Sequence, residues 1–125
     1  MKHYRIEFTE ENLPKILAQI DRALTLQTNN YEYAMNNEIA KREAYYDARN
    51  DYLREYHKTL LEILAKKEVA QTMSEKVAKA RVSEHELKMN IAEGEYKSAI
   101  SKSMVELEKM NSIKKLVDGR GKIGG

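Results

Sequence analysis

A stretch without helix breakers constrains the fold of this chain more than any other feature. From Asn30 to about Lys67 the sequence contains neither Gly nor Pro. A helix of that length spans roughly 55 Å. Its apolar residues recur at seven-residue intervals, at Ile39, Tyr46, Leu53 and Leu60. A domain of this size cannot bury so long a stripe by itself, so we expect another long helix to cover it, from the same chain or from a second copy.

The segment before the long helix predicts an extended arm and a short helix. Residues 3–8 alternate between apolar and polar side chains, which is typical of a half-buried strand or an extended arm. Asn12 and Pro14 then favour a helix start, and apolar residues follow at helical spacing up to Leu24. The polar residues 27–30 indicate either a turn or only a kink.

A polar segment over residues 66–82 interrupts the apolar pattern after the long helix. Thr72 with Glu75 has the spacing of a capping box, and Ser83 with Glu86 forms a better one. From Ser83 a second long helix is expected.

This second helix is expected to reach about Val117, because Gly119 is placed to end it. We therefore predict an elongated, coiled-coil-like, oligomeric all-α protein. Residues 1–29 would form the arm and short helix, 30–117 a long-helix hairpin that assembles, and 118–125 a flexible, Gly-rich basic tail.

The seam of the long helix changes in character along its length. Tyr and Arg occupy positions in its N-terminal half where a simple coiled coil has Leu, and the seam becomes aliphatic from Leu53 to Leu64. Polar seam residues weaken association but fix its register. We expect assembly to depend on the aliphatic half and on the apolar face of the second helix, at Leu53, Leu60, Ile63, Ile100, Met104 and Leu107.

Composition excludes several classes of site. With 22 basic and 20 acidic residues, the net charge of +2 does not by itself favour nucleic acid. The chain has no Cys, which excludes disulfides, thiolate metal sites and cysteine nucleophiles. No apolar run approaches the ~18 residues of a membrane span, and the N-terminus lacks a signal-peptide core. We expect a soluble intracellular protein that does not bind membranes.

No catalytic motif is present. His3, His57 and His85 are dispersed, without the spacing of metal ligands. The acidic residues form no convergent pair for acid–base chemistry. The Gly-Arg-Gly-Lys segment over 119–122 lacks the preceding strand and following helix of a phosphate-binding loop. We therefore predict a non-enzymatic protein without cofactor, metal or small-molecule substrate.

The remaining signal is the interleaving of basic and aromatic residues. Residues 41–58 alternate Lys and Arg with Tyr but also contain acids, whereas 66–81 contain only Glu68 and Glu75 as acids. Cations can hold a phosphodiester backbone, and Tyr rings can stack on bases. The same residues also fit helix packing and a solvated face. The candidate phosphate contacts are Lys66, Lys67, Lys76, Lys79 and Arg81, and the candidate stacking residues are Tyr45, Tyr52 and Tyr56.

Two short segments resemble the UvsY-like recombination mediators of T-even-type phages. Residues 31–37 read Tyr-Glu-Tyr-Ala-Met-Asn-Asn, similar to the segment that opens the family's long helix. Residues 81–88 read Arg-Val-Ser-Glu-His-Glu-Leu-Lys, similar to the start of its C-terminal helical part. The order of segments over 31–117 also agrees. The family's basic cluster lies in a Lys-Ala-Arg context, which Lys79-Ala80-Arg81 matches beyond the expected helix break.

The resemblance implies a ring-forming homo-oligomer that binds single-stranded DNA without sequence preference. It further implies a mediator that loads a recombinase onto strands covered by a single-strand binding protein, in the cytoplasm of a bacterial host. The alternative is a coiled-coil protein-interaction module, such as an adaptor, chaperone or host-protein inhibitor, that binds no nucleic acid.

Overall fold

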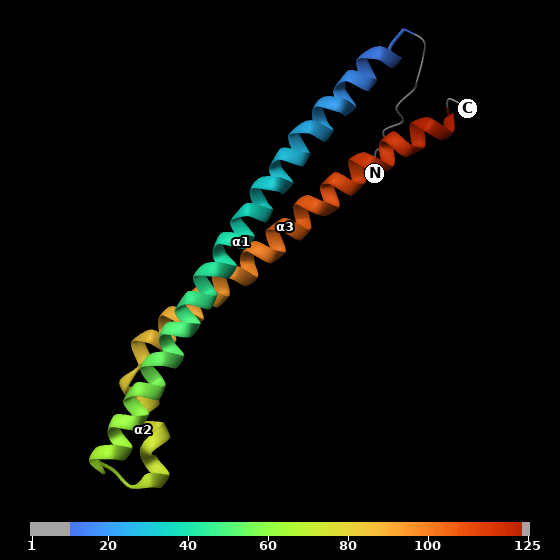
Figure 1. Ribbon diagram of the computed structural model, residues 1–125. Coiled ribbons are helices and arrows are strands. Elements are labelled where there is room, and N and C mark those ends of the chain that lie inside the picture. The colour runs from blue at the N-terminus through green and yellow to red at the C-terminus, as the bar shows by residue number, and fades with distance from the viewer. Residues whose placement is uncertain (1–10, 124–125) are drawn as a thin grey trace. The chain divides into compact units, whose positions relative to one another are not determined.

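The computed structural model describes residues 11–123, and within them the chain is all-α, as predicted. Figure 1 shows its elements, and no strand occurs in this range. The expected strand over 3–8 lies outside the described residues. The elements are α1 (Leu13–Lys66), the 3₁₀ helix η1 (Gln71–Met73), α2 (Ser74–Arg81) and α3 (Ser83–Ile123).

α1 is one continuous helix. It begins where Pro14 predicts, and the Asn12 carbonyl accepts a hydrogen bond from the Ile16 amide at 3.0 Å. It passes through residues 27–30 without a turn, where the Thr28 hydroxyl donates to the Leu24 carbonyl at 2.8 Å. The prediction of a separate short N-terminal helix is therefore wrong, because that segment is the first part of α1.

The chain forms two compact units. Unit 1 comprises Met1–Ala34 and Lys102–Gly125, and unit 2 comprises Met35–Ser101. In each unit a part of α1 lies against an antiparallel part of α3 (Figure 1). Unit 2 also contains the turn after α1, η1 and α2.

Unit 1 buries a polar side chain in its helix–helix contact. Gln27 is buried, and its amide donates to both the main-chain carbonyl (3.0 Å) and the carboxylate of Glu106 on α3. Burial of an amide is tolerated because its hydrogen bonds are made within the protein. The polar segment that suggested a turn is thus a point of attachment between α1 and α3. The other buried side chains among the described residues of unit 1 are Ile20, Ala34, Ser103 and Met110.

Unit 2 has a narrow core made mostly of small side chains. Its one large, fully buried side chain among the described residues is Ile63, near the end of α1. The other buried residues are Ser74, Ala78, Val82 and Ala99. Small residues let helices approach closely, but they bury little apolar surface. The core of unit 2 is therefore thin.

The junctions differ in detail from the predicted caps. Met73, not Thr72, is the N-cap of α2, and it makes no side-chain capping bond, so the Thr72–Glu75 capping box is wrong. α3 begins at Ser83 as expected. The carbonyl of Val82 accepts from the amides of His85 (3.0 Å) and Glu86 (3.1 Å), so the helical path is almost continuous there. α3 runs on to Ile123, past the end predicted near Gly119.

The contact between Gln27 and Glu106 predicts a pH-dependent stability. The hydrogen bond from Gln27, helped by Lys109, holds the pKa of the Glu106 carboxyl below its ordinary value of 4.5. A carboxylate of this kind contributes stability above its unfolded pKa, and the contribution is lost as the pH falls through the lowered folded pKa. Wild type should therefore be more stable than Glu106→Gln at pH 7, with a difference that narrows as the pH falls below 4.5.

Urea unfolding of both proteins between pH 7 and about 3 measures this difference. A gap that stays constant over that range would show that the ionised form of Glu106 makes no special contribution.

Candidate nucleic-acid and assembly surfaces

The predicted phosphate contacts lie on and around the turn that follows α1, a region called the basic turn below (residues 66–81). Lys66 is the last residue of α1, where a cation also interacts favourably with the helix dipole. Lys67 follows it with a φ of 52° and reverses the chain. Lys76 and Lys79 lie on α2, which Arg81 ends. All five side chains are exposed.

Two of these five cations are paired with carboxylates. Arg81 contacts Glu68 at 2.7 Å, which ties the end of α2 to the turn. Lys79 lies 3.7 Å from Glu86 on α3. Among residues 11–123, no carboxylate lies within ion-pairing distance of Lys66, Lys67 or Lys76. These three lysines are therefore the cations of the basic turn that remain available to an anionic ligand.

The predicted stacking residues take part in packing within the chain. Tyr45 stacks on Tyr46 (centroids 5.5 Å apart) and lies 6.1 Å from Tyr96 of α3. Tyr52 stacks on Tyr56 at 6.1 Å. Tyr45, Tyr52 and Tyr56 are all half-buried. Their positions therefore do not support the stacking role and favour the packing alternative.

The surroundings of Tyr52 agree with a packing role. Burial, with the carboxylate of Glu86 nearby, raises the pKa of the Tyr52 hydroxyl above 10.0, against the opposing effect of Lys79. Tyr52 on α1 is thus close to charged groups on both α2 and α3. The sequence indicated Tyr45, Tyr52 and Lys79 as separate candidates. It did not predict that Tyr96 lies beside Tyr45 or that Glu86 lies near Tyr52 and Lys79, which only the tertiary contacts reveal.

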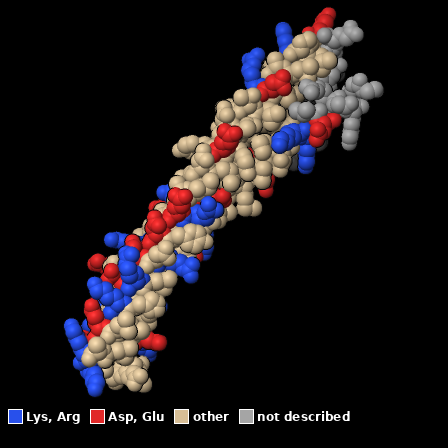
Figure 2. Space-filling model, in the orientation of Figure 1, with Lys and Arg blue, Asp and Glu red and all other residues tan. Residues whose placement is uncertain are grey.

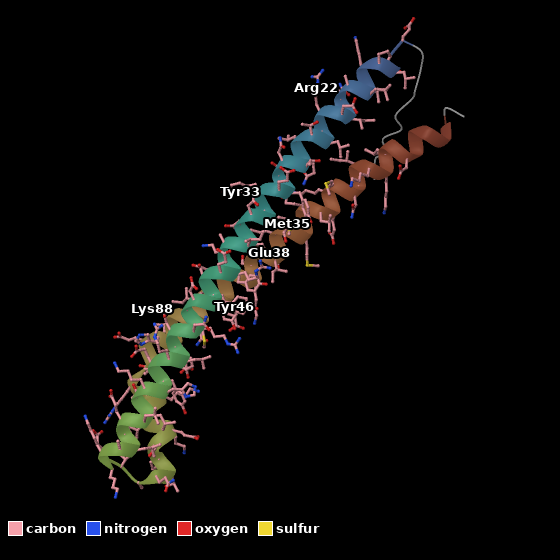
Figure 3. The ribbon with its side chains drawn as sticks, in the orientation of Figure 1. Arg22, Tyr33, Met35, Glu38, Tyr46 and Lys88 are labelled. Atoms are coloured by element: carbon pink, nitrogen blue, oxygen red, sulfur yellow. The ribbon has the colours of Figure 1, made fainter. Side chains whose placement is uncertain are left out.

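The seven-residue stripe of α1 is only partly covered within unit 2, where its fourth residue, Leu60, is half-buried. Ile39, Tyr46 and Leu53 remain 39%, 46% and 37% exposed, and Figure 3 marks Tyr46. The face that meets α3 instead carries Lys41, which bridges to Glu95 at 3.3 Å, and Tyr45. The sequence allowed this stripe to be covered either by a helix of the same chain or by a second copy. In unit 2 the same chain does not cover it fully.

The predicted assembly residues fall into three groups. Leu53, Met104 and Leu107 are exposed, and Leu60 and Ile100 are half-buried. Ile63 is only 1% exposed and packs inside unit 2. Its side chain is therefore part of the core of the single chain and not of a surface for another copy.

Three features of residues 11–123 bear on possible sites. The hollow beside the basic turn is lined by Ile63, Leu64, Lys67, Val69, Gln71 and Ser74. Over residues 11–123, no three His, Asp or Glu side chains are grouped so that they could hold a metal ion. None of the helices in that range is long and apolar enough to cross a membrane. Neither a protein-family model, nor a curated protein, nor a solved structure matches the chain.

The backbone of Lys67 predicts a stabilising substitution. A left-handed φ of 52° is unfavourable for a residue with a Cβ atom and is readily adopted by Gly. Lys67→Gly should therefore raise the free energy of unfolding by roughly 0.5–1 kcal/mol, after allowance for the greater entropy of unfolded Gly.

Chemical unfolding followed by circular dichroism measures this change, and Lys67→Ala is the matched control. Both variants lose the charge, but only Gly relieves the backbone. Equal stability of the two variants would contradict the assignment of strain at this position.

Proposed function

We propose that this protein is a non-enzymatic, oligomeric accessory protein that binds single-stranded DNA through the basic turn. The observation that carries this proposal is that Lys66, Lys67 and Lys76 are exposed and without carboxylate partners within the described residues. Cations that are not neutralised within the protein can exchange the counterions of a phosphodiester backbone, which favours binding.

The mixed charge of α1 limits the site to the basic turn. Figure 2 shows basic and acidic side chains interspersed along much of the visible surface. On α1, for example, Arg54 contacts Asp51 at 2.6 Å. A nucleic-acid backbone along that helix would meet carboxylates as often as cations, whereas the basic turn presents lysines with few acids.

Three lysines imply weak, salt-sensitive binding by one chain. Since single strands give a slope of about −0.7 per neutralised phosphate, the logarithm of affinity should fall with that of salt with a slope of roughly −2. Several copies acting on one strand would raise the overall affinity through effective concentration. The proposed DNA binding therefore depends on assembly of several copies.

The biological role follows from the resemblance to UvsY-like mediators. The protein would hold single-stranded DNA without reading its sequence and help to load a recombinase where a single-strand binding protein already covers the strand. A basic surface without base-stacking rings suits this role, because cations contact the phosphates that all sequences share.

Binding to fluorescent oligo-dT tests the function. Wild type should bind at about 50 mM salt, with affinity that falls steeply as salt rises. The triple variant Lys66→Gln, Lys67→Gln, Lys76→Gln should lose at least about tenfold in affinity and most of its salt dependence.

The matched control removes the same charge elsewhere, with Lys88→Gln, Lys102→Gln and Lys114→Gln at exposed positions. The control should retain most of the affinity. Equal losses in the two triple variants would refute the basic turn as the site, and no binding by wild type at about 50 mM salt would refute the function.

A second candidate function, a helical protein-interaction module, is favoured by the amount of exposed apolar surface. Tyr33 and Leu61 are 79% and 67% exposed, and Leu87 and Ile91 on α3 are also exposed. Leu87 and Ile91 are one turn apart on α3, and neighbouring exposed apolar side chains of this kind mark interaction surfaces. Failure to bind oligo-dT with retained association through these residues would favour this alternative.

A further inference from the structure

We propose that the exposed stripe of α1 in unit 2 pairs with the same stripe of a second copy, antiparallel and about a two-fold axis at Asn50. The stripe is defined by Ile39, Tyr46 and Leu53 and is continued by the exposed Leu61, because Leu60, the next residue of the seven-residue series, is half-buried. The residues between them on the same face, Glu43, Asn50 and His57, also belong to it. This inference specifies a two-fold pair of copies in place of the ring that the resemblance implies, and it does not depend on DNA binding.

The spacing of the stripe is that of a helix-pairing seam. Ile39, Glu43, Tyr46, Asn50, Leu53 and His57 alternate in steps of four and three residues. Steps of four and three keep side chains on one side of a helix and match the heptad pattern of paired helices. The face toward α3 lies elsewhere on α1, as the contact between Tyr45 and Tyr96 shows. The stripe is thus a second seam that α3 leaves open.

The stripe exposes enough apolar side chain to pair with a second copy. Ile39, Tyr46 and Leu53 are 39%, 46% and 37% exposed, and Leu61 is 67% exposed. These side chains are spread along several turns of one helix, so a second helix laid along the stripe would cover them together.

The pairing of polar side chains favours the antiparallel direction. With the axis at Asn50, positions equally distant on either side of it lie at the same level in the two copies. Glu43 then faces His57, and Ile39 faces Leu61. A parallel pair would instead place Glu43 against Glu43 and His57 against His57, which is unfavourable for the carboxylates.

Two further contacts fit the same register. Tyr46 of one copy lies within one residue of the level of Leu53 of the second copy, so the largest apolar side chains of the stripe meet. Asp47 likewise lies beside Arg54, whose present partner is Asp51 at 2.6 Å, one turn away on the same helix. Arg49 flanks its own counterpart near the axis, but it is exposed at the edge, where solvent screens the repulsion.

Asn50 gives the arrangement its register. On the axis, its amide meets the same amide of the second copy, and each side chain offers both donors and an acceptor. A polar residue in an otherwise apolar seam weakens pairing but penalises shifted registers, in which the amide would face an apolar group. The stripe is therefore self-complementary, as an isologous two-fold interface requires.

The first test measures mass in solution at micromolar concentration, by light scattering coupled to size exclusion. Wild type should have about twice the chain mass of 14.5 kDa. Leu53→Glu should raise the dissociation constant at least about 30-fold, as expected for an apolar residue at the centre of an interface. Ala44→Glu is the matched control, because Ala44 is exposed and lies on another side of α1, and it should remain paired. A monomeric wild type, or equal effects of the two variants, would overturn the proposal.

The second test uses the absence of Cys from the chain. Asn50→Cys alone should form an intermolecular disulfide under mild oxidation, because the two copies of this position meet at the axis. Ile39→Cys alone should not, since its two copies would lie more than about 30 Å apart. The double variant Ile39→Cys, Leu61→Cys should cross-link.

Each other pattern contradicts the proposal. Cross-linking of both single variants would show a parallel pair, and cross-linking of neither would show that a different surface or a different protein covers the stripe. These substitutions lie at exposed or half-exposed positions, so far-ultraviolet circular dichroism can confirm that helicity is unchanged.

Discussion

The packing of one helix against another covers only one side of each, and this limit determines much of the structure. Adjacent residues on α1 differ by about 100° around its axis, so Tyr45 and Tyr46 belong to different faces. Tyr45 meets Tyr96 of α3, whereas Tyr46 remains 46% exposed. α1 thus carries more apolar surface than a hairpin can bury. Ile63 is the one large, fully buried side chain among the described residues, so the apolar core within a single chain is small.

Local chemistry was enough to predict where α1 begins and ends and where α3 begins, but not that α1 continues through residues 27–30. Pro14 marks the start of α1, the cluster after Lys66 marks its end, and Ser83 begins α3. Gln27 suggested a turn because polar residues weaken a helical stripe. In the structure it is bonded to Glu106, a residue far away in the sequence, and no local pattern reveals that partner.

The sequence predicted which residues make up the candidate site, but not which of its cations are free of carboxylate partners within the described residues. The sequence placed five cations in the segment 66–81, yet the pairing of Arg81 with Glu68 depends on how the turn folds back on α2. The seven-residue spacing likewise could not show which tyrosines face α3, because two neighbouring faces of α1 both carry Tyr at this spacing. Which of the two seams α3 occupies is a property of tertiary packing.

The basic turn and the stripe both lie in unit 2, so pairing through the stripe would fix the distance between the basic turns of the two copies. In the antiparallel pair, Lys66 of each copy lies the same number of residues from the axis at Asn50, in opposite directions. The two basic turns would then be roughly 50 Å apart along the paired helices. A short strand could contact only one of them, whereas a strand long enough to reach both would gain from effective concentration. Pairing through the stripe would therefore favour long exposed strands over short ones without any further contact to the bases.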